Sequence, residues 1–332
     1  MDSTLTARFD ADGFQAFASA TQEPEWLLAL RREAFDHAEK MQWPERRHEE
    51  WIRTDIRAFQ LAKFGLPEFA AAPNVGDTSQ IHQLLGGVDL GGRIETINSF
   101  VSHQHLDEDL ASKGVIFGSL SDVAAAQPEL VRQYLFTAFD PDHDKFAALH
   151  AAFMSGGQFL YVPRGVVVDR PLHIGSILSD GGTDTTHTLV VIEDGAEATL
   201  LHESNSVDRK GGGLHLGGVE LLQKPGSHLR YVNLQEWGLK SYHFAQQKAT
   251  IDRDCTLQWT LAAMGSMLSK VNQSVDLVGP GANSQVNGVM FTEGRQHLAY
   301  HTQQYHRAES CRSDFLYKAA QQDKSRTVWR GM

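Results

Sequence analysis

Side chains that could bind a metal ion are concentrated near the end of the chain. His297, His301 and His306 precede Cys311. Imidazole and thiolate ligands together suit zinc or an iron–sulfur cluster. On a strand, His297 and His301 would share one face, and His306 would lie on the other. Because the spacing is not a standard zinc pattern, two interpretations stay open: a metal site using His301, His306 and Cys311, or partly exposed histidines of an ordinary strand.

Cys255 and Cys311 are the two cysteines of the chain, which is too few for a disulfide framework. One bridge is possible, but a reduced cytosolic pair is the expectation. A nearby arginine could lower the pKa of either thiol and make it reactive. The competing interpretation is that each cysteine is a small buried filler.

Nucleotide-binding patterns are absent from the sequence, which lacks G-x-x-x-x-G-K-[ST]. The glycine-rich segment 211–218 is not a dinucleotide fingerprint, because Leu216 occupies the place of the third glycine. We expect a flexible hairpin or a loop between strands there. The carboxylate pair Glu49–Glu50 is expected to be solvated. The sequence therefore assigns no catalytic residue and no intrinsic cofactor.

Two helical or mixed zones precede a β-rich one. Residues 1–75 are predicted to be helical, because Pro24 can start a helix and apolar or small residues follow at helical spacing. These are Leu27, Leu30, Ala34, Ala38 and Met41. A loop is predicted at 71–79.

The zone 76–157 is predicted to be mixed α/β. Short strands are expected at 94–97 and 115–117. Ser121 and Asp122 could cap a helix over 123–139, which Pro128 divides, and a further helix is expected at 145–154.

Turn residues recur at a nearly constant interval in the third zone, 158–332. Gly195, Gly226, Asp254 and Gly281 are separated by 31, 28 and 27 residues, and a strand-like segment follows each. A fixed period of this size indicates stacked repeats, none of which can bury its apolar face alone. The predicted fold is mainly β, with a right-handed parallel β-helix core behind an N-terminal α-helical region. An antiparallel sandwich or jelly roll is the alternative.

Composition excludes several functional classes. The 332 residues are 41% hydrophobic with a net charge of −11, and no basic cluster suits nucleic acid. The first residues do not form a signal peptide, and no apolar run approaches the roughly 18 residues of a membrane span. We expect a cytoplasmic protein that binds neither nucleic acid nor membrane.

Three segments resemble the SufB/SufD family of the SUF iron–sulfur cluster assembly machinery. Residues 44–55 resemble the N-terminal signature of its SufD branch, residues 162–172 look like the entry to its β-helix core, and residues 285–331 resemble the core motif. The matching positions are Arg47, Glu49, Trp51, Thr54, Asp55, Pro163, Gly165, Pro171, His306, Ser313, Lys318 and Gly331. The resemblance extends from about residue 40 to the end of the chain.

Two departures qualify the resemblance. The family usually carries Asp at the place of His301 and Pro at the place of Ala308. SufB proteins carry a mid-core Glu-Gly-Cys segment whose cysteine is implicated in sulfur transfer, whereas this chain has His202-Glu203-Ser204, so the resemblance favours SufD. The family continues well past the position of Met332. We therefore expect a C-terminally truncated chain with an incomplete β-helix, whose cluster-facing histidine lies beyond it.

The resemblance implies a non-catalytic scaffold subunit that pairs with a SufB-like subunit and recruits a SufC-like ATPase. It implies no resident cofactor and a nascent iron–sulfur cluster shared with the SufB-like partner. Two other functions stay open from the residues alone. One is a secreted-type β-helix carbohydrate-active enzyme, and the other is a metal-binding barrel built on His297, His301 and His306.

Overall fold

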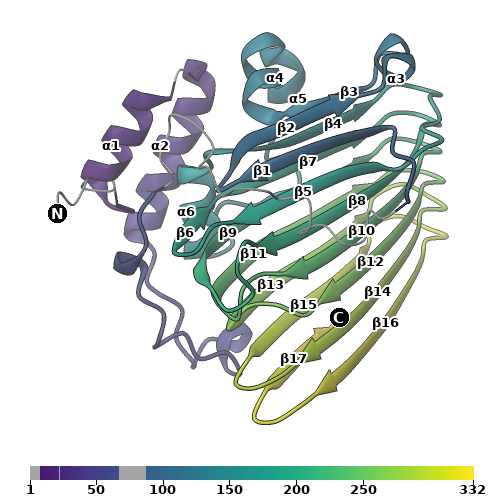
Figure 1. The fold of residues 1–332 in the computed structure, drawn as a ribbon. Helices are drawn as coiled ribbons and strands as arrows, with labels where there is room; N and C mark the ends of the chain where they lie inside the picture. The colour runs from purple at the N-terminus through teal and green to yellow at the C-terminus, as the bar shows by residue number, and fades with distance from the viewer. Residues whose placement is uncertain (1–7, 22, 67–86) are drawn as a thin grey trace.

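Helices flank two large sheets (Figure 1). The structure, a computed structural model, describes residues 8–21, 23–66 and 87–332, so the loop predicted at 71–79 lies outside the described residues. The helices are α1 (Ala11–Ala20), α2 (Glu25–Lys40), α3 (Glu108–Ser112), α4 (Leu120–Ala126), α5 (Pro128–Tyr134) and α6 (Lys145–Phe153), with 3₁₀ turns η1 (Glu49–Trp51) and η2 (Leu61–Lys63). Within the described ranges, no helix is long and apolar enough to cross a membrane.

The helix starts follow local sequence signals. Pro24 is the N-cap of α2, as predicted, and Leu27, Ala34 and Ala38 are buried on one face. Pro128 opens α5 and so divides the predicted 123–139 helix. The cap of α4 was predicted wrongly: the Asp122 N–H donates to Ser119 Oγ at 3.2 Å, so Ser119 is the cap rather than Ser121 or Asp122.

The described residues contain seventeen strands, which form two sheets. Sheet A has the order β16 (Arg312–Gln321), β14 (Asn283–Thr292), β12 (Thr256–Ala263), β10 (His228–Glu236), β8 (Glu197–Ser206), β5 (Leu172–Leu178), β1 (Gly92–Ile97), β2 (Phe100–Leu106). Sheet B has the order β17 (Arg326–Gly331), β15 (His297–His306), β13 (Leu268–Leu277), β11 (Lys240–Ile251), β9 (Gly212–Gln223), β7 (Thr186–Ile192), β4 (Gly156–Val162), β3 (Ile116–Ser119), and β6 (Gly182–Asp184) also pairs with β9.

From β7 onward, consecutive strands alternate between the two sheets, so the chain winds as a coil of about six turns. From β4 and β5 onward the described neighbours are parallel, and the antiparallel pairs β1–β2 and β3–β4 lie at the start. The mainly β parallel β-helix with an N-terminal helical region is confirmed. The antiparallel sandwich and the closed barrel around the late histidines are wrong.

The predicted turns stack at one corner of the coil. Their residues have positive φ: Gly195 (63°), Gly226 (69°), Asp254 (56°) and Gly281 (75°). Gly165 (69°) and Ser310 (59°), which the periodicity did not predict, extend the series at both ends. The backbone N–H at these turns donates to the turn one level on, for example Gly195 to the Pro225 carbonyl at 2.9 Å and Gly226 to the Arg253 carbonyl at 2.8 Å. Glycine suits this left-handed conformation because it has no Cβ to clash.

Both cysteines belong to a column of small residues just after these turns. The column runs Ala196, Ser227, Cys255, Ala282, Cys311. Cys255 is buried, and its Sγ donates to the Lys224 carbonyl at 3.0 Å. Burial raises the pKa of the Cys255 thiol, which fits the filler interpretation.

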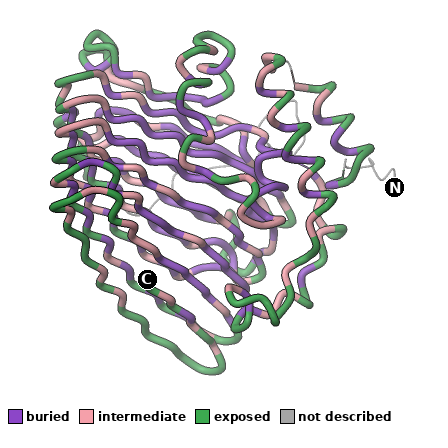
Figure 2. Tube along the Cα trace, turned by 180° about the vertical axis from the view of Figure 1, so that it is seen from behind, coloured by how far each residue is buried: buried purple, intermediate pink, exposed green. Residues whose placement is uncertain are grey.

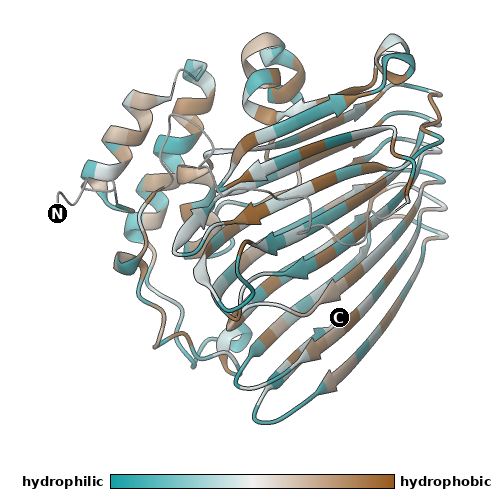
Figure 3. Ribbon diagram, in the orientation of Figure 1, coloured by the Kyte–Doolittle hydropathy of each residue, from teal (hydrophilic) through white to brown (hydrophobic). Residues whose placement is uncertain are grey.

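The strands in the middle of the coil are largely buried (Figure 2), and apolar and polar residues both occur along them (Figure 3), so the interior of the coil is mixed in polarity. Near the corner it holds large apolar side chains such as Tyr231, Leu257 and Trp259. At the other end, buried polar side chains replace them, including His202, His215 and His243. Burying a polar group costs free energy unless hydrogen bonds replace its contacts with water.

The glycine-rich segment was predicted wrongly as a hairpin or loop. Residues 212–223 form β9, which is buried over nearly its whole length. A Cβ at Gly217 would lie 2.1 Å from His215 Nε2, and a Cβ at Gly218 would lie 2.4 Å from His187 Nδ1. These two glycines therefore make room for histidine rings on opposite faces of the sheet.

The N-terminal helices attach to the coil through α6. Phe14 stacks on Phe35 at 4.5 Å between ring centroids, and Phe153 of α6 lies edge-on to both, at 5.7 Å and 5.8 Å. Arg31 of α2 is buried and pairs with Glu23 at 2.5 Å. Aromatic packing of this kind makes α6 the bridge between the helical region and sheet B.

The turn column gives a paired test of the fold. Replacing Gly195 by Ala should lower the free energy of unfolding by about 1–2 kcal/mol, because no atom would touch the new Cβ and only its positive φ would be strained. Asp254→Gly should leave stability unchanged or raise it, because glycine relieves the same strain. Urea unfolding measures both. An Ala at 195 that costs nothing would contradict the assigned turn.

Candidate functional site

The two segments that resemble the family signatures meet on the outer face of sheet B. The η1 turn lies against the strands β13, β15 and β17. Glu49 Oε1 accepts a hydrogen bond from Arg330 Nη2 at 2.6 Å. Trp51 is buried and stacks on Phe146 of α6, with ring centroids 5.4 Å apart. The N-terminal segment is therefore fastened both to α6 and to a late strand of the coil.

A row of outward-facing residues crosses sheet B beneath this contact. Strand register aligns His187, Gly218, Gln246, Asn272, His301 and Arg330, which we call the polar row. Gln246 Oε1 accepts the Asp140 N–H at 2.6 Å, and Asn272 lies 2.9 Å from His143 Nε2. The row thus supplies partners to the segment that joins α5 to α6.

Lys270 is the most deeply buried cation of this cluster. Only 2% of the residue is exposed. Its ammonium donates to Asn272 Oδ1 and lies 5.5 Å from the centre of the Trp51 ring. Burial lowers the pKa of Lys270 from 10.5 to about 8, and the charges of Glu50 and Asp144 oppose this only in part.

Glu50 and His143 form the acidic side of the cluster. The two side chains approach to 3.4 Å between Oε2 and Nε2. The hydrogen bond from His143 lowers the pKa of Glu50 to about 2. The same hydrogen bond raises the pKa of His143 above its usual value, although burial opposes this. Of the pair predicted to be solvated, Glu49 is exposed, whereas Glu50 is partly exposed and pairs with His143.

Asn272 contacts both Lys270 and His143, so the protonation state of one restricts that of the other. An ammonium can only donate, so Asn272 must present Oδ1 to Lys270 and its Nδ2 then donates to His143 Nε2. In that arrangement Nε2 is unprotonated, and the hydrogen bond from His143 to Glu50 that shifts both pKa values is absent. A charged His143 can donate to Glu50 only if the Asn272 side-chain amide flips. Its Nδ2 then faces Lys270, which must be an uncharged amine in order to accept. The geometry therefore favours one positive charge on this pair at a time.

His301 lies at the edge of the cluster but does not meet the other predicted ligands. Burial and the charge of Lys270 lower the pKa of His301 to about 4. His306 pairs instead with Ser313 Oγ at 2.8 Å, and Cys311 Sγ lies 3.4 Å from the Gly279 carbonyl. His306 and Cys311 thus have contacts of their own, away from His301. In the part of the chain that the structure describes, no three His, Cys, Asp or Glu side chains are arranged to hold a metal ion.

The remaining signature positions have local structural roles. Arg47 pairs with Glu45 at 2.8 Å on the surface. The carboxylate of Asp55 accepts hydrogen bonds from the side chain and the backbone N–H of Arg57, which lower the pKa of Asp55 to about 2. Thr54 is buried.

The core-entry and core-motif positions lie at strand ends and edges. Pro163 accepts the Val166 N–H at 3.1 Å across a turn that contains Gly165, and the Pro171 carbonyl accepts the Gly91 N–H at 3.0 Å. Lys318 is exposed on β16, and Gly331 ends β17 beside the Trp329 ring.

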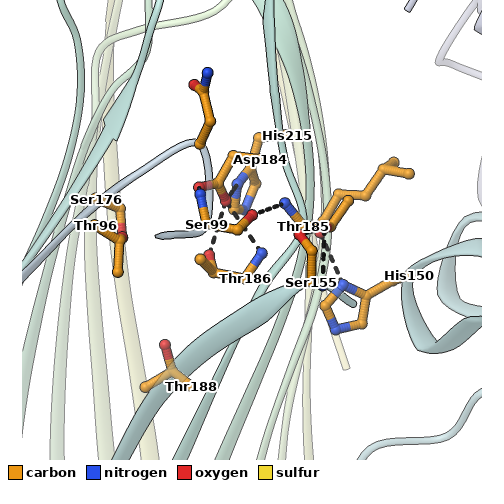
Figure 4. Close-up of polar contacts among 12 residues, drawn as sticks. Thr96, Ser99, His150, Ser155, Ser176, Asp184, Thr185, Thr186, Thr188 and His215 are labelled. Atoms are coloured by element: carbon orange, nitrogen blue, oxygen red, sulfur yellow. Dashed lines mark hydrogen bonds and ion pairs between the residues drawn. The ribbon is translucent and has the colours of Figure 1, made fainter. Parts of the chain in front are cut away.

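A second polar network lies inside the coil around Asp184 (Figure 4). Its carboxylate accepts the Ser99 N–H at 2.9 Å, both the N–H and the hydroxyl of Thr186 at 3.2 and 2.8 Å, and His215 Nδ1–H at 2.9 Å. Burial alone would raise the pKa of Asp184, but the His215 and Thr186 hydrogen bonds hold it below its usual value. Ser99 lies in the β1–β2 turn, so Asp184 ties that turn to the coil.

His215 directs its other nitrogen toward a small interior cavity. The cavity measures about 20 Å³ and is lined by polar side chains that include His202, His243 and Gln247. That volume holds nothing larger than a water molecule. Burial lowers the pKa of His202 to about 3 and that of His243 well below its usual value, so both rings are neutral. This network stabilises the interior and offers no room for a substrate.

Sequence reasoning missed the residues that build these networks. Lys270, His143 and Asp184 lie in unremarkable polar contexts, and their partners are distant in sequence. One signal was present: glycines that alternate with His215 in a β-compatible run indicate space reserved for large side chains.

Comparisons with known proteins cover nearly the whole chain. Residues 14–174 match the model of the SufBD protein N-terminal region, and residues 176–332 match the SufBD core domain of SUF system FeS cluster assembly. The chain is 23% identical over 334 residues to the iron–sulfur cluster assembly protein SufB of Bacillus subtilis, covering 94% of this chain and 68% of that protein. It is 24% identical over 336 residues to an iron–sulfur cluster assembly SufBD family protein of Staphylococcus saprophyticus, with the same coverage.

Lys270 predicts a pH dependence of stability. The folded-state pKa of about 8 lies below the unfolded value of 10.5, so the unfolded chain binds more protons between these values. The free energy of unfolding of the wild type, relative to Lys270→Met, should therefore rise by up to about 3 kcal/mol from pH 8 to pH 10.5. Urea unfolding of both proteins at several pH values measures it. A constant difference would contradict the buried charge.

The glycines of β9 give a second test. Gly218→Ala should destabilise by about 1–3 kcal/mol, because its Cβ would lie 2.4 Å from His187 Nδ1 and 2.6 Å from His150 Nε2. Gly212→Ala on the same strand is the matched control, because its Cβ would meet no atom closer than 3.4 Å. Thermal unfolding of the two variants compares them. Equal effects would mean that the histidine rings do not occupy this space.

Proposed function

Because the chain belongs to the SufBD family of iron–sulfur cluster assembly proteins, we propose that it is a non-catalytic scaffold subunit of the SufD type. It pairs with a SufB-like subunit and recruits a SufC-like ATPase in the cytoplasm. The observation that carries the proposal is that the sequence match and the fold coincide. The segment that matches the family's core domain, residues 176–332, is also the segment that contains the regular coil from β7 to β17. The nascent cluster is cargo shared with the SufB-like partner.

The positions of the cysteines support the SufD type. A sulfur acceptor needs an accessible thiolate. Cys255 is buried with a raised pKa, and Cys311 occupies the same corner column. SufB proteins carry a cysteine in the middle of the core. At the position that resembles it, this chain has Ser204, which faces the interior. Sulfur transfer then belongs to the partner.

The architecture supports a platform rather than an enzyme. The sequence has no phosphate-binding loop, so ATP hydrolysis belongs to a separate subunit. Stacked turns present long faces that suit contacts with other proteins. The ionisable groups of the outer cluster pair with one another and fasten the N-terminal segment, which is a structural use of charge. Membership of this family also argues against the secreted-type β-helix carbohydrate-active enzyme.

Co-purification tests the partnership. The tagged chain, expressed with the SufB-like and SufC-like subunits of its own organism, should retain both through affinity and size-exclusion steps. The SufB-like and SufC-like subunits expressed without it provide the control for partner folding. Retrieval of neither partner, while those two still bind each other, would overturn the scaffold proposal.

Cysteine replacement tests the SufD assignment separately. A Cys255→Ala, Cys311→Ala double variant should support cluster assembly as well as the wild type, because neither thiol receives sulfur. The measurement is the activity of a cluster-dependent reporter enzyme in cells that rely on this system, with co-purification as the control for folding. Lost assembly with intact partner binding would show that a thiol of this chain takes part in the chemistry.

A further inference from the structure

A buried chain of hydrogen bonds links α6, β7 and β9 on the outer face of sheet B. His150 Nδ1 lies 2.8 Å from the Leu216 carbonyl, and His150 Nε2 lies 3.0 Å from His187 Nδ1. His187 Nε2 lies 3.0 Å from Glu220 Oε1. All three side chains are at most 1% exposed. Because water cannot reach them, each hydrogen in this chain must come from the groups themselves.

The protons can be counted from one end. A carbonyl only accepts, so His150 must carry its hydrogen on Nδ1. Burial, and then the neighbouring His187, lower the pKa of His150 well below its usual value, so the His150 ring is neutral and Nε2 is an acceptor. His187 must therefore donate from Nδ1. His215 and Arg31 are the other charged or titratable groups that act on His150, and both disfavour a proton there.

Glu220 fixes the other end. Its Oε1 accepts the Phe136 N–H at 2.7 Å, and its Oε2 accepts the N–H groups of Ala138 and Phe139 at 2.7 and 2.9 Å. Both carboxyl oxygens therefore act as acceptors toward the backbone. The contact between His187 Nε2 and Glu220 Oε1 still needs one hydrogen. Since Nδ1 of His187 already carries its own, that hydrogen is a second proton on the His187 ring.

We infer that His187 is a buried imidazolium whose second proton, held against the Glu220 carboxylate, locks residues 136–139 onto β9. The pair is neutral as a whole, which offsets the cost of burying either charge. Phe136 and Phe139 lie edge-on to the His187 ring, with centroids 5.3 and 5.5 Å away, and shield it from water. Phe136 itself has a φ of +59°, so the lock also holds a strained turn.

The lock positions the N-terminal region. Residues 136–139 lead from α5 into α6, and α6 carries α1 and α2 through Phe153. One proton on His187 therefore helps to hold the helical region on the coil. Gly218 is required beside it, because any Cβ there would displace the His150 and His187 rings.

Imidazole nitrogen NMR tests the charge directly. In ¹⁵N-histidine-labelled full chain at pH 7.5, the ring assigned to His187 should show two protonated nitrogens, and His187→Gln, which makes that assignment, should remove its signals. The His150 ring should show one protonated and one bare nitrogen. A bare Nε2 on His187 in the wild type would overturn the inference. The wild-type spectrum decides this point even if a variant fails to fold.

Glu220→Gln tests the lock. The glutamine amide can donate to a neutral His187, so the imidazolium signal should disappear. The Phe136 N–H then faces a donor instead of an acceptor, and its hydrogen exchange should accelerate by roughly tenfold, while Ala138 and Phe139 stay protected. Glu193→Gln is the matched control, because Glu193 accepts from the nearby Tyr134 hydroxyl at 2.7 Å without touching His187. An imidazolium that survives Glu220→Gln would contradict the shared proton.

Discussion

The structure depends on one constraint: each strand of the coil pairs in parallel, and in constant register, with the strand one turn later. Register turns a position in one strand into a row that crosses a sheet. The corner column of small residues, the stacked left-handed turns and the polar row all follow from it. A substitution in one turn therefore changes the packing of the turns directly above and below it. This is the quasi-one-dimensional behaviour of solenoids.

The rows explain how a short N-terminal region is held on a long coil. The polar row presents acceptors and donors at the spacing of successive strands. The segment before α6 uses two of them in order, with Gln246 accepting from Asp140 and Asn272 contacting His143. Glu220 lies two residues beyond the row position on β9 and accepts from residues 136–139. The η1 turn adds Glu50 and Trp51 over Lys270. For a scaffold that works between two partners, as we propose, such fastening keeps the helical region and the coil in one fixed arrangement.

The features that sequence predicted were those that local chemistry controls. A tight turn that needs positive φ favours glycine wherever it occurs. The constant interval between Gly195, Gly226 and the later turns therefore indicated both the turns and the coil. Proline controls helix starts in the same local way, as Pro24 and Pro128 do. The glycines of β9 misled because their meaning is not local: Gly217 and Gly218 are small to admit rings from His215, His187 and His150. The metal candidates lie apart for a local reason: alternation along β15 puts His301 and His306 on different faces, as the sequence predicted.

Cross-linking between neighbouring turns tests the register most directly. In a chain whose own cysteines are replaced, Thr260→Cys and Asn287→Cys place two thiols opposite each other on the outer face of β12 and β14. Disulfides need Cα atoms within about 7 Å, so this pair should form a bond on mild oxidation, whereas Thr260→Cys with Phe291→Cys, which lies further along the same face of β14, should not. A bond in the second pair and none in the first would contradict the register and every row derived from it.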